Sequence, residues 1–278
     1  MNDFNLLEKI DRIRNRFEEE LQSRAHLYHP IDIERVRKEQ WQVERFVRNS
    51  PENENDAYEA LKRCLRWKKS FGIHERSDAS FAKELWELCA VEVNGRDHCG
   101  RLIQWEAFRN QRKFKELDLI AKQFVAHNIE RLDRMAGENG FILVSDLGGA
   151  GISNLDIDMI RFKLATIEYY PYGLRQMLIV DLPWLLNSVM NLILTLMRPA
   201  IRDITIFCKR RELSKYIAEE HIHRSLDGKR EEYCFPPNMR PMDQMMDELN
   251  LSENFIDHFY KTFKLSRTIN QTTVANYG

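Results

Sequence analysis

The chain has 278 residues, of which 43% are hydrophobic and 31% are charged, a composition typical of a globular protein. Its 42 basic and 43 acidic residues leave a net charge of −1, so no overall positive field favours nucleic acid as a partner. Five widely spaced cysteines form no C-x-x-C pair, which favours reduced thiols in the cytoplasm over disulfides or a zinc site.

The first 90 residues predict a subdomain built from helices alone. Their N-terminus is charged and has no apolar stretch of signal length, so we expect no secretion signal. Four stretches have apolar residues at helical spacing and no strand pattern between them: 6–21, 30–49, 56–72 and 80–90.

From residue 91 the pattern changes to short apolar strands that alternate with helices. Strand patterns occur at 91–105, as a hairpin-like pair, and at 141–144, 175–181 and 201–207. Helix patterns occur at 116–135, 153–169, 184–197 and 211–224. This alternation predicts an α/β domain over 91–224, in which helices cover a mostly parallel sheet. Residues 225–278 are expected to form a polar tail with one short helix, 251–263, and a frayed end, 270–278.

No motif in the chain predicts catalysis or cofactor binding. Gly148-Gly149-Ala150-Gly151 follows a strand as a dinucleotide loop would, but it lacks the G-x-G-x-x-G spacing and reads as a tight turn. The turn Asp97-His98-Cys99 has no further ligands at metal spacing. Neither G-x-S-x-G nor H-E-x-x-H is present. We therefore expect no enzymatic activity, no cofactor and no metal.

The stretch 169–199 is the most distinctive part of the chain. A Tyr-Tyr-Pro turn ends a helix, an apolar run of strand length follows, and Pro183 begins a helix that is apolar on most sides. Such a helix needs a cover on most of its faces, so it is a membrane span, a buried core helix or a lid over a lipid. Asp181 opposes a span, because a charged residue costs about 2.5–3.5 kcal/mol at the centre of a membrane helix. We expect no transmembrane anchor.

Two basic clusters remain outside these patterns. Residues 112–115 precede a helix, and Lys209-Arg210-Arg211 directly follows the last strand. Each is either ordinary solvated surface or a contact for anionic lipid head groups. Such a contact contributes about 1 kcal/mol of binding free energy per basic residue near a membrane.

Two segments, taken with the helical N-terminal region, resemble the CRAL-TRIO, or secretory-type lipid-transfer, family. In ILVSDLGGAGIS, Asp146 and Gly149 match a family strand that ends in Asp-x-x-Gly. In YYPYGLRQMLIVDLPWLLN, the Tyr-Pro turn, Asp181 and Pro183-Trp184 match the strand and the start of the gate helix. The likeness extends over 32–217. GISNLDIDMIRF and IVDLPWLLN are most similar to the N-terminal domain of motile sperm domain-containing proteins.

The resemblance implies an apolar cavity that is floored by the sheet, roofed by a gate helix at 184–197 and able to hold one lipid. Basic residues that contact the membrane would be Lys209, Arg210 and Arg211. The residues implied in lipid binding are Leu143, Phe162, Leu178, Val180, Trp184, Leu185, Val189, Met190, Ile193 and Leu196. The expected partners are a hydrophobic small molecule or phospholipid and, transiently, a membrane surface reached from the cytoplasm.

The ligand class stays open at this stage. Family members that transfer phosphatidylinositol have a glutamate after the Tyr-Pro turn and a lysine at the start of the last strand, where this chain has Tyr172 and Asp203. Another phospholipid, a sterol-like molecule and a retinoid-like molecule are the alternatives. Three hypotheses for function follow: a lipid-binding or transfer module, a membrane-recruitment or protein-interaction module with a vestigial pocket, and, last, a small-molecule enzyme.

Overall fold

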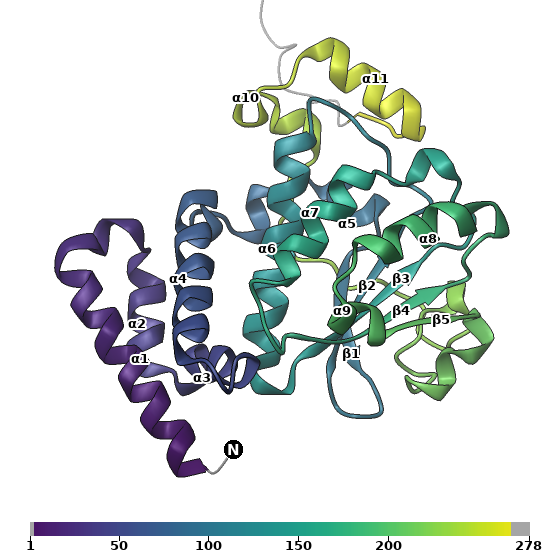
Figure 1. The fold of residues 1–278 in the computed structure, drawn as a ribbon. Coiled ribbons are helices and arrows are strands. Elements are labelled where there is room, and N and C mark those ends of the chain that lie inside the picture. The colour runs from purple at the N-terminus through teal and green to yellow at the C-terminus, as the bar shows by residue number, and fades with distance from the viewer. Residues whose placement is uncertain (1–2, 268–278) are drawn as a thin grey trace, which may run out of the picture.

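The computed structural model describes residues 3–267, and the predicted frayed end at 270–278 lies outside that range. Helices α1 to α4 form a lobe on the left of Figure 1, and helix α5 connects this lobe to the sheet. The bounds of these helices are α1 Asp3–Arg24, α2 Pro30–Lys38, α3 Gln40–Asn49, α4 Glu54–Phe71 and α5 Lys83–Leu88.

Local signals fix the ends of the lobe helices. Asn53 caps α4 by accepting hydrogen bonds from two backbone N–H groups, and Gly72 ends it in the left-handed conformation at φ 70°. The predicted single helix over 30–49 is wrong, because the backbone becomes extended at Glu39 and separates α2 from α3. Apolar side chains of α1, α3 and α4 then bury one another as the core of the lobe.

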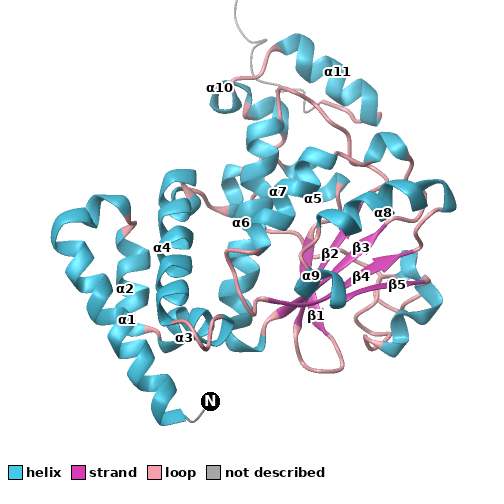
Figure 2. Ribbon diagram, in the orientation of Figure 1, coloured by secondary structure: helices cyan, strands magenta, loops and turns pink. Residues whose placement is uncertain are grey.

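The second part of the molecule is a five-stranded sheet whose order in space follows its order in sequence (Figure 2). Strand β1 is antiparallel to β2, and the remaining neighbours are parallel. The predicted α/β class, with a helical N-terminal region and a mostly parallel sheet, is confirmed. The bounds of the strands and of the helices between them are β1 Glu92–Arg96, β2 Leu102–Ala107, α6 Asp118–Ala136, β3 Phe141–Asp146, α7 Ile157–Ile167, β4 Leu174–Val180, α8 Asn187–Leu196, α9 Pro199–Asp203 and β5 Thr205–Cys208.

Because the parallel strands follow one another in sequence order, right-handed crossovers put their helices on one face of the sheet. Buried side chains of α6, α7 and α8 indeed share one cluster with alternate residues of β3 and β4, including Leu143 and Met177. The intervening residues, such as Val144 and Leu178, belong to a second cluster on the opposite face. That face is covered by the segment after β5.

The segment after β5 differs from its prediction. The expected α-helix over 211–224 is absent, and two 3₁₀ helices, Arg210–Lys215 and Arg224–Leu226, lie at the ends of that range. Up to residue 267, the tail contains two α-helices, α10 Met246–Leu249 and α11 Glu253–Phe263, where one was expected. Its apolar residues are buried against α5 and α6, with Phe259 only 2% exposed, so this segment is part of the packed structure.

Buried ion pairs join the helical lobe to α6. Arg45 of α3 donates to both carboxylate oxygens of Asp133 at 2.6 and 2.7 Å, and both side chains are nearly inaccessible to water. Glu130, one turn earlier, lies 2.6 Å from the Lys68 ammonium and accepts a hydrogen bond from Arg35 at 2.8 Å. Each buried charge has an opposite charge as its partner in place of water, so these pairs hold the lobe against the sheet region.

Candidate functional site

A small apolar cavity lies between the sheet, α7 and the inner face of α8. Its volume is about 50 Å³. Of the twelve residues that line it, ten are apolar and three of those are methionines. The lining consists of Phe108, Ser145, Leu147, Leu155, Ile160, Lys163, Leu164, Met177, Ile179, Met190, Ile193 and Met197.

Helix α8 covers this cavity with residues at helical spacing. The 3₁₀ turn Trp184–Leu186 leads into it, and Leu186, Met190, Ile193 and Met197 repeat at three or four residues on its buried side. The opposite side of this segment also carries large apolar side chains that face solvent. Their exposed fractions are 84% for Trp184, 42% for Leu185, 50% for Leu192 and 38% for Leu196.

The segment is therefore apolar on both sides, and its polar residues occupy only a narrow strip between them. Asn187, Ser188, Asn191 and Thr195 are all exposed. A core helix would be expected to bury its large apolar side chains or replace them with polar ones at the surface. Clustered large apolar side chains in water generally mark a surface that meets a partner or a membrane.

An open groove of about 560 Å³ follows the edge of α8 that faces β5. Ile179 and Met190 line both this groove and the cavity, so these two side chains separate the cavity from solvent. Leu194 and Phe207 continue the apolar lining outward, and Lys209 and Glu212 lie at the polar end.

Charged pairs connect the carboxyl ends of the parallel strands beside the start of this segment. Asp146, which ends β3, accepts from Arg109 at 2.5 Å, and Asp181, which follows β4, pairs with Arg210 after β5. Asp181 has a positive φ of 51°, so the chain turns sharply before Pro183. This arrangement holds the turn before Trp184 to the carboxyl end of the sheet.

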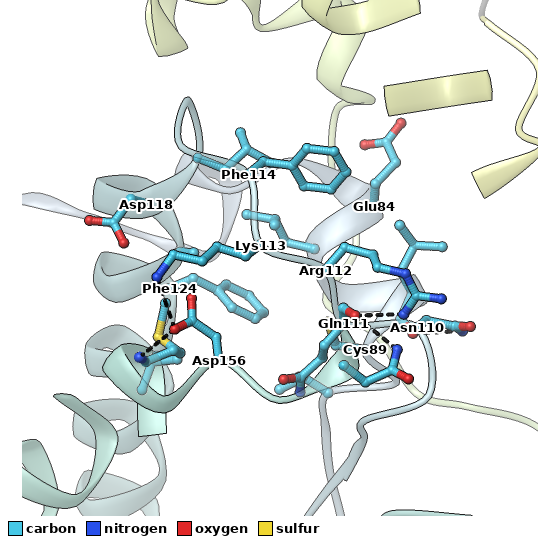
Figure 3. Close-up of a pocket in the computed structure, with 18 of the residues that line it drawn as sticks. Glu84, Cys89, Asn110, Gln111, Arg112, Lys113, Phe114, Asp118, Phe124 and Asp156 are labelled. Carbon is cyan, nitrogen blue, oxygen red and sulfur yellow. Dashed lines mark hydrogen bonds and ion pairs between the residues drawn. The ribbon is translucent and has the colours of Figure 1, made fainter. Parts of the chain in front are cut away.

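A second cavity of about 150 Å³ lies on the other side of α7, beneath the C-terminal helix α11 (Figure 3). Phe114 and Phe124 contribute aromatic rings to it, and Lys113 reaches across to Asp156 at 3.2 Å. Cys89 also lines this cavity, where burial raises the pKa of its thiol to about 12. Leu155 lines both cavities.

The structure brings together only some of the residues predicted to bind lipid. Met190 and Ile193 line the cavity, and Leu143 and Val189 belong to the same apolar cluster without lining it. Trp184, Leu185 and Leu196 face solvent. The structure does not test ligand contact for any of them.

Three of the predicted positions point elsewhere. Leu178 and Val180 lie on the opposite face of the sheet, in a core cluster with Ile142 and Val144, and they do not line the cavity. Phe162 faces the helical lobe, where its ring centroid is 5.4 Å from that of Phe71.

In β4, Met177 and Ile179 line the cavity in place of Leu178 and Val180. In a strand buried on both faces, alternation marks two sets of residues but not which set faces the cavity. Ser145 and Lys163 were also missed, because a serine and a lysine among apolar residues give no periodic signal of their own.

The predicted membrane-contact cluster divides into different roles. Arg210 is half-buried and pairs with Asp181, so its charge is already compensated inside the protein. Lys209 and Arg211 are exposed. Within residues 3–267, no group of three or more His, Cys, Asp or Glu side chains is arranged to hold a metal ion. In the same range, no helix has the length and apolar character that crossing a bilayer requires.

The sheet is mostly parallel, helices α6, α7 and α8 cover one of its faces, and an apolar cavity lies beneath α8. A family model described as the CRAL/TRIO domain matches residues 89–228 of this chain. The chain therefore belongs to the CRAL/TRIO family, whose members bind lipophilic small molecules, and the family resemblance seen in the sequence is confirmed. The closer likeness to motile sperm domain-containing proteins stays a prediction.

A crystal structure of Sfh5 has a similar fold. The two share 15% sequence identity at a TM-score of 0.56, and the match covers 95% of this chain and 99% of that chain. At this identity the match supports the fold alone, and it includes the helical lobe and the C-terminal segment outside the family model.

Proposed function

We propose that this chain binds one lipid in the cavity beneath α8 and transfers or presents it at a membrane surface. The observation that carries the proposal is the lid segment 184–197, which is apolar toward the cavity and apolar toward solvent. A helix of this kind can exchange its contacts with the protein core for contacts with lipid at little cost, because both surroundings are apolar.

The energetics favour a covered ligand in water and an open cavity at a membrane. Each CH₂ group of an acyl chain costs about 0.8 kcal/mol when exposed to water, so a carrier must enclose the chain during transfer. Trp184, Leu185, Leu192 and Leu196 are available to enter the interface of a bilayer when α8 meets it.

The cavity volume makes movement of α8 a requirement of the proposal. Pockets that enclose small organic ligands measure about 300–1,000 Å³, and this one measures about 50 Å³. A lipid therefore fits only when α8 moves outward. Met177, Met190 and Met197 support such adaptability, because methionine has three rotatable bonds and fills spaces of different shape.

The direct test of binding is native mass spectrometry of the full chain, purified without detergent and then incubated with vesicles of mixed lipids. The proposal expects a complex with one lipid per chain. A chain that retains no lipid and extracts none from vesicles would refute it.

The test of the lid is lipid transfer between two vesicle populations. Leu192→Asp puts a charge on the exposed face of α8, so it should lower vesicle binding and transfer by about tenfold or more while leaving the fold intact. The matched control is Leu119→Asp on α6, which is 62% exposed and distant in sequence from the lid. Equal loss in both variants would mean that the effect is general surface charge.

The small cavity also favours a second candidate, a membrane-recruitment module whose pocket is vestigial. The two functions separate in Ile160→Trp, which fills the α8 cavity from its α7 wall. A carrier takes up lipid as the parent chain and loses this uptake in the variant. A recruitment module takes up no lipid in either chain and binds vesicles equally well in both.

A further inference from the structure

Three polar side chains meet inside the apolar layer between the sheet and α7. Glu106 of β2 and Ser145 of β3 are register partners, and the Ser145 hydroxyl donates to Glu106 Oε1 at 2.6 Å. The ammonium of Lys163, from α7, pairs with the same carboxylate oxygen. Glu106 is 8% exposed and Ser145 is 3% exposed, so the cluster is shielded from water.

This cluster is the polar part of an otherwise apolar site. Ser145 and Lys163 are the two polar residues among the twelve that line the α8 cavity. Glu106 lines the second cavity, beneath α11. The Glu106–Lys163 pair, together with Leu155, therefore forms the wall between the two cavities, and a ligand that extends through the first cavity toward the second meets this pair.

The charges of the pair determine which ligand group is compatible with it. The carboxylate and the ammonium cancel, so a ligand anion would add an uncompensated charge at a buried position, which is strongly unfavourable. A hydroxyl group can accept a hydrogen bond from the ammonium and donate one to the carboxylate. The ammonium has three N–H donors, and within residues 3–267 Glu106 is its ion-pair partner.

We propose that the Glu106–Lys163 pair selects a neutral lipid that carries a hydroxyl group, such as a long-chain or sterol-like alcohol, over a lipid with a free carboxylate. The proposal rests on the proposed lipid-binding function and specifies the ligand of that site.

The test compares oleyl alcohol with oleate, which have the same chain and differ only in the polar end. Calorimetric titration of the full chain with each probe gives a ratio of Kd values. The parent chain should prefer the alcohol. In Glu106→Gln the ammonium of Lys163 loses its counter-ion and can pair with the carboxylate of oleate, so the ratio should shift toward oleate by about tenfold or more.

Two further variants keep the test decisive. Glu87→Gln, which removes an exposed carboxylate paired with Lys83, should leave the ratio unchanged. The double variant Glu106→Leu with Lys163→Met removes both charges and the hydrogen-bonding atoms of both side chains, so it should fold even where the single variant does not. It should bind oleyl alcohol about tenfold more weakly than the parent chain, because both partners of the hydroxyl are lost.

The possible results are distinguishable. A parent chain that binds oleyl alcohol, with the same ratio in Glu106→Gln and undiminished alcohol affinity in the double variant, would overturn the selectivity and leave the proposed function intact. A parent chain that prefers oleate would overturn it as well. A parent chain that binds neither probe and retains no lipid from vesicles would instead refute the proposed function.

Discussion

Glu130 offers the sharpest test of how the helical lobe is held to the sheet region. The carboxylate is 7% exposed and lies between the Lys68 ammonium and the Arg35 guanidinium. Burial by itself would raise its pKa, but the charges of Lys68 and Arg35 outweigh burial and hold the pKa at about 2, against an ordinary value of 4.5. At 1.36 kcal/mol per pH unit, this difference corresponds to about 3 kcal/mol of folding free energy at neutral pH.

The variant Glu130→Gln should therefore lower the free energy of unfolding by about 3–5 kcal/mol, because it leaves the Lys68 ammonium buried without its counter-ion. Urea denaturation at pH 7, followed by tryptophan fluorescence, measures this change, since Trp67 stacks on Tyr169 at the same interface. The matched control is Glu39→Gln. Glu39 and Arg134 also pair across the interface, but both are more than one third exposed, so the cost should be about 0.2–1 kcal/mol.

The pH dependence gives an independent check of the same quantity. A folded-state pKa below the unfolded value stabilises the protein above the unfolded pKa, and this stabilisation is lost as the pH falls through the folded pKa. The free energy of unfolding of the parent chain should fall by the contribution of Glu130 between about pH 5 and pH 2. The free energy of unfolding of Glu130→Gln should not show this decrease. A variant that costs less than about 1 kcal/mol at pH 7, or that keeps the full acid transition, would refute the reasoning.

Three further results are expected. Ile193→Ala on the buried side of α8 should lower the free energy of unfolding, measured by urea denaturation, by about 2–5 kcal/mol. Leu192→Ala on the exposed side should change it by at most about 0.5 kcal/mol, and equal changes in both variants would contradict the orientation of the helix. Cys99 and Cys234 are exposed and should react rapidly with an aromatic disulfide reagent, whereas Cys64 should react only after unfolding, because it is buried and burial raises the pKa of its thiol to about 12. Rapid reaction of all five thiols in the folded chain would contradict this. Phe259→Ala should lower the free energy of unfolding, measured by urea denaturation, by about 3–5 kcal/mol. A decrease below about 1 kcal/mol would mean that α11 is not packed against the rest of the protein.

The sequence was sufficient where local chemistry and periodicity decide the structure. The helical lobe, the alternation of strands and helices and the apolar segment after Pro183 follow from residue spacing and from proline and glycine at the ends of elements. Among the residues implied in lipid binding, Met190 and Ile193 line the cavity beneath α8. The break between α2 and α3 was missed, since Glu39 is a residue that a helix readily accepts.

Only the tertiary structure decided which residues meet at the site. Leu178 and Met177 are adjacent and equally apolar, and their assignment to opposite faces depends on how β4 pairs with β3 and on which face α8 covers. Glu106 and Lys163 are separated by a helix and a strand, so no local pattern joins them. Spacing along the chain determines the faces of an element, whereas contacts between distant elements exist only after the crossovers have brought those faces together.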